Sequence, residues 1–149
     1  MKPEFSPLQP AWTLPPLDHV GAGPSGLVFY PGVGLPKRYD DHFFLCDFLG
    51  GDSYSRVLAL AVEPVGAGFK VVDEHPFVEN VLPTDVDFGY DGKMYMTDWG
   101  GGWGSGDKGE LYAVWDPQAI LDPRVAEVTR LFREGFAQRD SDELAALLA

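Results

Sequence analysis

Cysteine and basic residues are scarce in this sequence, and each scarcity removes a class of protein. Cys46 is the only cysteine among 149 residues, so no disulfide can form within the chain. It lies in the apolar run 42–46, which predicts a small buried hydrophobe and not a nucleophile. Lys and Arg total 11 against 23 Asp and Glu, a net charge of -12 that repels phosphate backbones and anionic lipid. We therefore expect no nucleic acid and no anionic membrane as partners.

Long apolar runs are also missing. No stretch approaches the ~20 apolar residues of a membrane-spanning helix. Residues 1–16 hold no apolar segment of the kind found in signal peptides. We expect a soluble chain without a membrane span, and any export signal would have been removed or would lie on another polypeptide.

Motifs of well-known catalytic and metal sites are equally scarce. The histidines, His19, His42 and His75, lack zinc-ligand spacing, and no H-E-x-x-H or D-x-D-x-D-G stretch occurs. The glycine-rich stretch 100–109 lacks the Lys-Ser/Thr ending of a phosphate loop. The sequence thus assigns no catalytic residue and no metal ligand, although His19 would suit an acid or base if it lined a cleft.

Glycine and proline, by contrast, are plentiful, with 18 and 13 residues, and favour many short strands joined by turns. Residues 1–24 are rich in proline and predict an extended arm. Asp91 and Gly92 form the pair expected of a two-residue hairpin turn. The expected strands cover residues 27–30, 42–48, 56–63, 69–73, 84–88, 93–98 and 110–115.

Beyond residue 115 the apolar spacing becomes helical. Asp122 is the expected N-cap, with Pro123 at the first helical position. Gly135 should weaken the end of this helix. Asp140 then predicts the start of a second helix over residues 144–148.

The strands fall into two similar sets. Asp47 and Asp98 end matching strands one period apart, close to the ~40–50 residues of a propeller blade. The first set has four strands and the second only three, whereas a blade has four. The missing strand is expected from the N-terminal arm or from another chain. The fold class expected is mainly β, with about two four-stranded β-propeller blades and a short helical tail. The boundaries are an arm over 1–24, blades over 25–117 and a tail over 118–149.

Six residues are candidates for ligand binding, all near strand ends or in the glycine-rich loop: Asp47, Thr84, Asp85, Asp98, Trp99 and Trp103. Strand ends in a propeller approach the axial mouth, where a carboxylate can meet a ligand. Alternatively, Asp47 and Asp98 accept backbone N–H bonds in their turns. Strand alternation puts Asp85 on the face opposite Thr84, where it needs a donor or a cation. A structural hydrogen bond between blades and a calcium site formed from Asp85, Asp87, Asp91 or Asp98 both remain open. Trp99 and Trp103 would suit stacking on a sugar ring or burial in the core.

Several of these segments resemble one known family. The runs that carry the resemblance are Gly23-Pro24-Ser25-Gly26-Leu27-Val28-Phe29-Tyr30-Pro31-Gly32, Gly34-Leu35-Pro36, His42-Phe43-Phe44-Leu45-Cys46-Asp47-Phe48, Thr84-Asp85-Val86-Asp87-Phe88-Gly89-Tyr90-Asp91-Gly92 and Tyr95-Met96-Thr97-Asp98-Trp99. They resemble the C-terminal part of glucose/sorbosone dehydrogenase-like β-propellers. The similarity is greatest to the exported haem-binding propeller proteins of planctomycete and verrucomicrobial type, and it covers residues 14–117.

This resemblance implies a six-bladed propeller, a periplasmic or secreted location and oxidation of a sugar or alcohol with pyrroloquinoline quinone (PQQ) and calcium. In the family an Arg-x-Arg-Asp motif contacts the quinone. The matching stretch here is Leu82-Pro83-Thr84-Asp85, which keeps only the aspartate. No C-x-x-C-H haem motif occurs.

Two functions follow from the sequence. The first is a fragment or subunit of such a propeller, which would be an enzyme only within a larger assembly. The second is a non-enzymatic module: a self-assembling propeller closed by three chains, or a carbohydrate-binding or scaffold protein. Open blade edges predict a homo-oligomer or the missing blades as the partner in either case.

Overall fold

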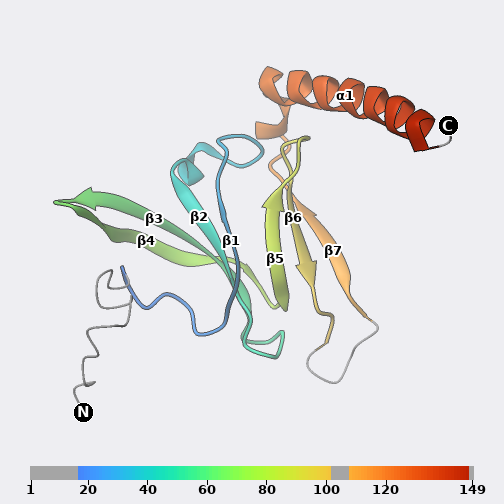
Figure 1. Ribbon diagram of the computed structural model, residues 1–149. Helices are drawn as coiled ribbons and strands as arrows, with labels where there is room; N and C mark the ends of the chain where they lie inside the picture. The colour runs from blue at the N-terminus through green and yellow to red at the C-terminus, as the bar shows by residue number, and fades with distance from the viewer. Residues whose placement is uncertain (1–16, 102–107, 148–149) are drawn as a thin grey trace, which may run out of the picture.

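Two antiparallel sheets and one long helix make up the part of the chain described by the computed structural model, residues 17–101 and 108–147 (Figure 1). The first sheet has the order β1-β2-β3-β4 and the second β5-β6-β7. The strands are β1 (Pro24–Phe29), β2 (His42–Asp47), β3 (Arg56–Val65), β4 (Gly68–Glu79), β5 (Pro83–Phe88), β6 (Met94–Asp98) and β7 (Glu110–Val114). The helical segments are η2 (Lys37–Tyr39), η3 (Ala119–Leu121) and α1 (Pro123–Leu147).

The prediction of a mainly β chain is confirmed, and each expected strand is present. The largest difference lies in β4, which continues past residue 73 to Glu79 because it pairs with β3 over its whole length. The first sheet has four strands as predicted. The second has three, and within the described residues no further strand pairs with β7.

The two sheets repeat one hydrogen-bonding plan. Pro24 lies opposite Asp47 at the start of β1, and Pro83 lies opposite Asp98 at the start of β5. Each first strand then has an irregularity that skips one residue before pairing resumes. Counting outward from these pairs, each paired position of β5, β6 and β7 has a counterpart in β1, β2 and β3. The internal similarity predicted from the sequence is therefore also a similarity of register.

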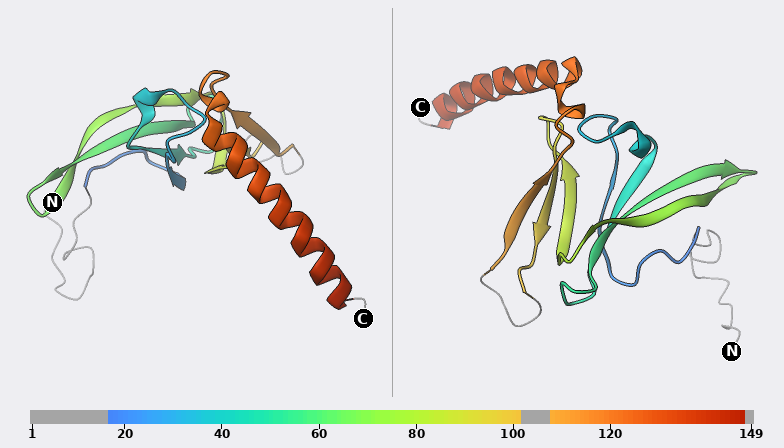
Figure 2. Two further views of the ribbon diagram at one scale, coloured as in Figure 1. Left: turned by 90° about the horizontal axis from the view of Figure 1, so that it is seen from above. Right: turned by 180° about the vertical axis from the view of Figure 1, so that it is seen from behind.

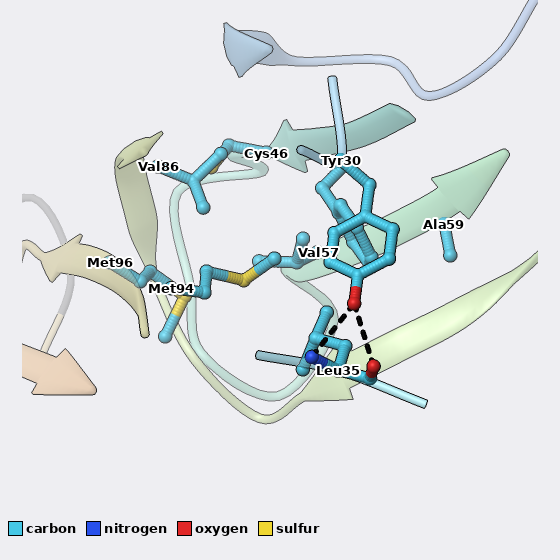
Figure 3. Close-up of a cluster of buried hydrophobic side chains, with 9 residues drawn as sticks. Tyr30, Leu35, Cys46, Val57, Ala59, Val86, Met94 and Met96 are labelled. Atoms are coloured by element: carbon cyan, nitrogen blue, oxygen red, sulfur yellow. Dashed lines mark hydrogen bonds between the residues drawn. The ribbon is translucent and has the colours of Figure 1, made fainter. Parts of the chain in front are cut away.

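The sheets pack face to face around one shared core (Figure 3). Strand alternation directs every second side chain of β2 inward, which buries Phe44 and Cys46 while Phe43 and Leu45 turn to the opposite face. The fully assembled core consists of Tyr30, Leu35, Phe44, Cys46, Val57, Ala59, Val86, Met94 and Met96. Burying a large apolar side chain contributes roughly 1.5–3 kcal/mol, so this layer holds the two sheets together.

The thiol of Cys46 lies within this core. Burial raises its pKa to about 12, which agrees with the prediction of an inert apolar residue. We expect the native chain at about pH 8 to react with a thiol reagent at least ~100-fold more slowly than the urea-unfolded chain, because the thiolate is the reactive form. Absorbance of the released chromophore would measure this. Equal rates before and after unfolding would contradict the buried position.

The β5–β6 connection differs from the predicted two-residue turn. The Gly89 N–H donates to the Lys93 carbonyl oxygen at 2.8 Å, which leaves a three-residue loop. The backbone φ is positive at Gly92 (79°) but not at Asp91. A type I turn closed by a left-handed glycine needs only one positive φ, whereas the predicted turn needs two. The Asp-Gly pair located the hairpin correctly but not its loop length.

The C-terminal region forms one helix, so the prediction of two helices is wrong. Asp122 caps α1 as expected, since its carboxylate accepts the Arg124 N–H at 2.8 Å. The helix then continues through Gly135 to Leu147. Glycine costs only about 1 kcal/mol inside a helix, and ion pairs from Arg130 to Glu127 and Glu134 support the turns before it.

Only the first turns of α1 rest on the sheets. Val125 is buried, and the Phe132 ring stacks on Tyr90 in the β5–β6 loop with 4.0 Å between centroids. Further along, the helix projects away from both sheets (Figure 2). Among the described residues, no helix is both long enough and apolar enough to cross a membrane.

Candidate functional site

Asp47 occupies the end of β2 and is fully buried. Its Oδ1 accepts the backbone N–H groups of Ala22 and Gly23, each at 2.8 Å. Its Oδ2 lies 3.4 Å from the Arg56 Nε. The carboxylate therefore closes the turn that leads into β1, which is the structural alternative to ligand binding that the sequence left open.

Asp98 occupies the counterpart position at the end of β6. Its Oδ2 accepts the Leu82 N–H at 2.8 Å, and its Oδ1 accepts the Gly100 N–H at 2.7 Å. The next residue repeats the pattern too, because the Trp99 N–H donates to the Leu82 carbonyl oxygen just as the Phe48 N–H donates to Gly23. The two aspartates thus belong to the repeated turn of each sheet.

Thr84 and Asp85 lie where the first strands of the two sheets meet. Thr84 hydrogen-bonds Thr97 on β6 through the two hydroxyls, 2.7 Å apart. Asp85 is exposed, and its Oδ1 accepts the Val86 N–H at 2.9 Å. The hydrogen bond between the sheets comes from a neighbour instead: Ser25 Oγ donates to the Pro83 carbonyl oxygen at 3.0 Å.

Trp99 lies beside Asp98 with 41% of its surface exposed. Its ring meets Phe48 edge to face, with 6.4 Å between centroids. Phe48 is the counterpart of Trp99, so the two repeats bring two aromatic rings together at this end of the sheets. The other candidate tryptophan, Trp103, lies outside the described residues.

The weak calcium site considered from the sequence does not form from these carboxylates. Asp87 accepts the adjacent Phe88 N–H, and Asp91 binds the Tyr95 hydroxyl and the Lys93 ammonium group. Within the described residues, no three His, Cys, Asp or Glu side chains gather so as to hold a metal ion. Leu82 and Thr84 stand at the positions where the family that the sequence resembles has its two arginines, and they do not fit the anionic PQQ. Leu82 is apolar and buried, and the uncharged Thr84 hydroxyl is hydrogen-bonded to Thr97.

A chain of ionisable side chains joins η2, β2 and β4, and the sequence analysis missed it. The two carboxylate oxygens of Asp73 lie 3.2 Å from His42 Nε2 and 3.1 Å from His75 Nδ1. Arg38 Nη2 donates to His75 Nε2 at 3.0 Å, which places the ring proton of a neutral His75 on Nδ1. The register explains the cluster, since His42 and Asp73 flank the small Ala61 of β3 in one row. Pairing the three predicted strands would have revealed this row.

Hydrogen bonds from His42 and His75 lower the pKa of Asp73 below its ordinary value of 3.8. A lowered carboxyl pKa adds stability that is complete above the unfolded-state value and disappears as pH falls through the folded-state value. Urea unfolding of the parent and Asp73→Asn between about pH 6 and about pH 2 should show a stability difference that shrinks below about pH 4. A difference that stays constant over this range would contradict the assignment.

At the end of the strands opposite Asp47 and Asp98, a pocket of about 800 Å³ lies between the β1–β2 loop and the start of α1. Charged residues of both signs line it: Lys37, Asp40, Asp41, Asp122 and Arg124. Arg124 is already paired with Asp122 at 2.6 Å. The lining holds no serine, cysteine or histidine, so it contains no Ser–His or Cys–His pair.

The sites described so far are occupied mainly by contacts within the chain. Comparisons with protein-family models, with curated proteins and with solved structures find no match. The carboxylates of the candidate site serve backbone N–H groups, and the Asp73 cluster ties two strands together. What the residues do support is the stacking of similar sheets, which are joined at Ser25 and Pro83.

Proposed function

We propose that this chain is a two-blade unit of a glucose/sorbosone dehydrogenase-like β-propeller and takes part in sugar or alcohol oxidation only together with further blades. The observation that supports this is the face-to-face stacking of two sheets with the same register. Propellers are built by stacking such sheets around a central channel. Here β1 and β5 lie side by side as the first strands of their sheets (Figure 1), the arrangement expected of innermost strands.

The proposal accounts for the incomplete second sheet. The strand β7 is the last of three, and most of its side chains are exposed. An unpaired strand edge recruits another strand, because its free N–H and C=O groups otherwise rely on water. A fourth strand for this sheet is thus one of the contributions that the rest of the assembly would make.

This chain's own role in oxidation would be to complete the scaffold. Its candidate carboxylates are engaged by backbone groups, and Leu82 and Thr84 replace the arginines that contact the quinone in the family. The cofactor contacts and the catalytic base would then lie on the other blades.

Native extracts offer the direct test. Gel filtration followed by immunodetection should place the chain in a fraction well above its own mass, and that fraction should reduce a redox dye with sugars or alcohols when PQQ and calcium are added. Depleting the fraction with an antibody to this chain should remove the dye-reducing activity. Elution of the chain as a monomer, or full activity after depletion, would contradict the proposal.

One observation favours the carbohydrate-binding alternative: the partly exposed Trp99 beside Phe48. Aromatic faces stack on sugar rings, so binding should change tryptophan fluorescence. A titration with oligosaccharides should then give a saturable change that Trp99→Ala abolishes and that Trp115→Ala, another partly exposed tryptophan, leaves intact. The same change in both variants would argue against a site at Trp99.

A further inference from the structure

The repeated register shows which face of each sheet looks toward the other. In the second sheet, Val86, Met94 and Met96 point at the first sheet and form the core with it (Figure 3). Their counterparts in the first sheet are Leu27, Phe43 and Leu45. These residues point away from the second sheet, on the far face of the first. The second sheet thus uses this face to stack on the first sheet. The corresponding face of the first sheet has no sheet stacked on it within the described residues.

The exposed fractions of the corresponding side chains differ between the two sheets. Val86 is 4% exposed, whereas its counterpart Leu27 is 59% exposed. Phe29 is 49% exposed and packs edge to face on Phe43, with 4.9 Å between the ring centroids. We define the open apolar face by four residues of β1 and β2: Leu27, Phe29, Phe43 and Leu45. None is charged, although the net charge of the chain is -12.

The outer face of the second sheet has a different character. The counterparts of Gly26, Val28 and Cys46 there are Asp85, Asp87 and Thr97, and all three are exposed. Stacking this face on an apolar partner would bury the Asp85 and Asp87 carboxylates, each of which accepts one backbone N–H and faces no cation there. Burying such a charge costs several kcal/mol or forces the carboxylate to take up a proton.

The Gly26 position adds a steric reason. The first strand of the next sheet runs so close to Gly26 that a Cβ there would lie 2.6 Å from Asp85 Oδ1 and 2.9 Å from Asp85 Cα. A sheet can therefore follow the first one only because this position is glycine. At the counterpart position the second sheet has Asp85 itself, whose Cβ would overlap a strand that followed the second sheet equally closely.

We propose that the open apolar face docks a further antiparallel sheet from outside these 149 residues, and that the Asp85 face prevents a second copy of this chain from docking there head to tail. The docking sheet would carry glycine at the Gly26 counterpart and apolar side chains at the counterparts of Val28, Phe44 and Cys46. This inference rests on the proposed function, since it names the kind of partner that the two-blade unit takes. It also favours the missing blades over three identical chains.

The test gives the second sheet the face that the proposal requires. The triple variant combines Asp85→Gly, Asp87→Val and Thr97→Ala in the full chain. Alanine is used at position 97, although the counterpart there is Cys46, so that no new thiol is introduced. Light scattering over a concentration series should show at least twice the mass of the parent chain at the higher concentrations. Adding Leu27→Asp to the triple variant should restore the parent's mass, because it places a charge on the open apolar face.

A charge-matched control separates docking from a general loss of repulsion. Asp52→Gly combined with Glu63→Val removes the same charge elsewhere on the exposed surface and should leave the mass unchanged. Circular dichroism checks that each variant is folded, and Asp87→Val alone replaces the triple variant if the latter is not. The proposal is overturned if the grafted variant keeps the parent's mass, if Leu27→Asp fails to reverse association, or if the parent itself associates through Leu27. These outcomes use the purified chain, so they are independent of any oxidation activity in the native fraction.

Discussion

Gly34→Ala should unfold the chain at a far lower urea concentration than Gly32→Ala, although both glycines belong to one loop and both have a positive φ, 95° and 80°. An added Cβ on Gly34 would lie 1.5 Å from the Gly92 carbonyl oxygen, whereas none of the surrounding atoms lies within 4 Å of one on Gly32. The left-handed backbone alone costs an alanine about 1–2 kcal/mol. We expect the additional overlap at Gly34 to cost at least about 3 kcal/mol more, since backbone on both sides must move.

This pair of variants isolates one contact between the two sheets. Gly34 belongs to the loop after β1, Gly92 to the hairpin between β5 and β6, and the Gly34 carbonyl oxygen accepts the Asp116 N–H at 2.7 Å. Equilibrium urea unfolding followed by tryptophan fluorescence gives the free energies of unfolding. Equal midpoints for the two variants would show that the loop and the hairpin do not approach as described.

Asp47→Ala should lower the free energy of unfolding by about 2–5 kcal/mol. The substitution leaves the N–H groups of Ala22 and Gly23 without their acceptor, and a buried unsatisfied donor costs about 1–3 kcal/mol. Asp47→Asn keeps an oxygen in place and should lose less, because only the charge assistance disappears.

Asp85→Ala is the matched control for this prediction. Asp85 also accepts a backbone N–H, from Val86, but it is exposed, so water can replace the carboxylate. Its loss should stay within about 0.5 kcal/mol. If Asp47→Ala were as mild as Asp85→Ala in the chain without ligand, the carboxylate would not be closing the turn, and ligand binding would become the better explanation of its burial.

Much of the fold could be predicted because its signals are local. Alternation at Phe44 and Cys46 and the similarity between the Asp47 and Asp98 turns both depend on residues close together in the sequence. The hairpin length depended on whether Tyr90 paired with the opposite strand or belonged to the loop, and this is decided by the register. The helix was predicted to break near Gly135 from a propensity of about 1 kcal/mol, which neighbouring ion pairs can offset.

The site was harder to predict because its residues meet through strand pairing. The sequence singled out Asp47 and Asp98, and the structure identifies the backbone N–H groups that donate hydrogen bonds to these two carboxylates. Nothing local connects His42 with Asp73, which come together only because β3 lies between their strands. The opposed faces at Gly26 and Asp85 likewise become visible only once the two registers are aligned.

Gly92 connects the long helix mechanically to the contact between the two sheets. On one side of this glycine lies Val125 of α1, whose Cγ2 would be 3.1 Å from an added Cβ, and on the other lies Gly34. The β5–β6 hairpin thus packs against both the N-terminal end of α1 and the loop after β1. A tilt of α1 would displace Val125 against the hairpin and so press the hairpin against that loop. Load applied to the far end of α1 would therefore act as torque on the angle between the two sheets.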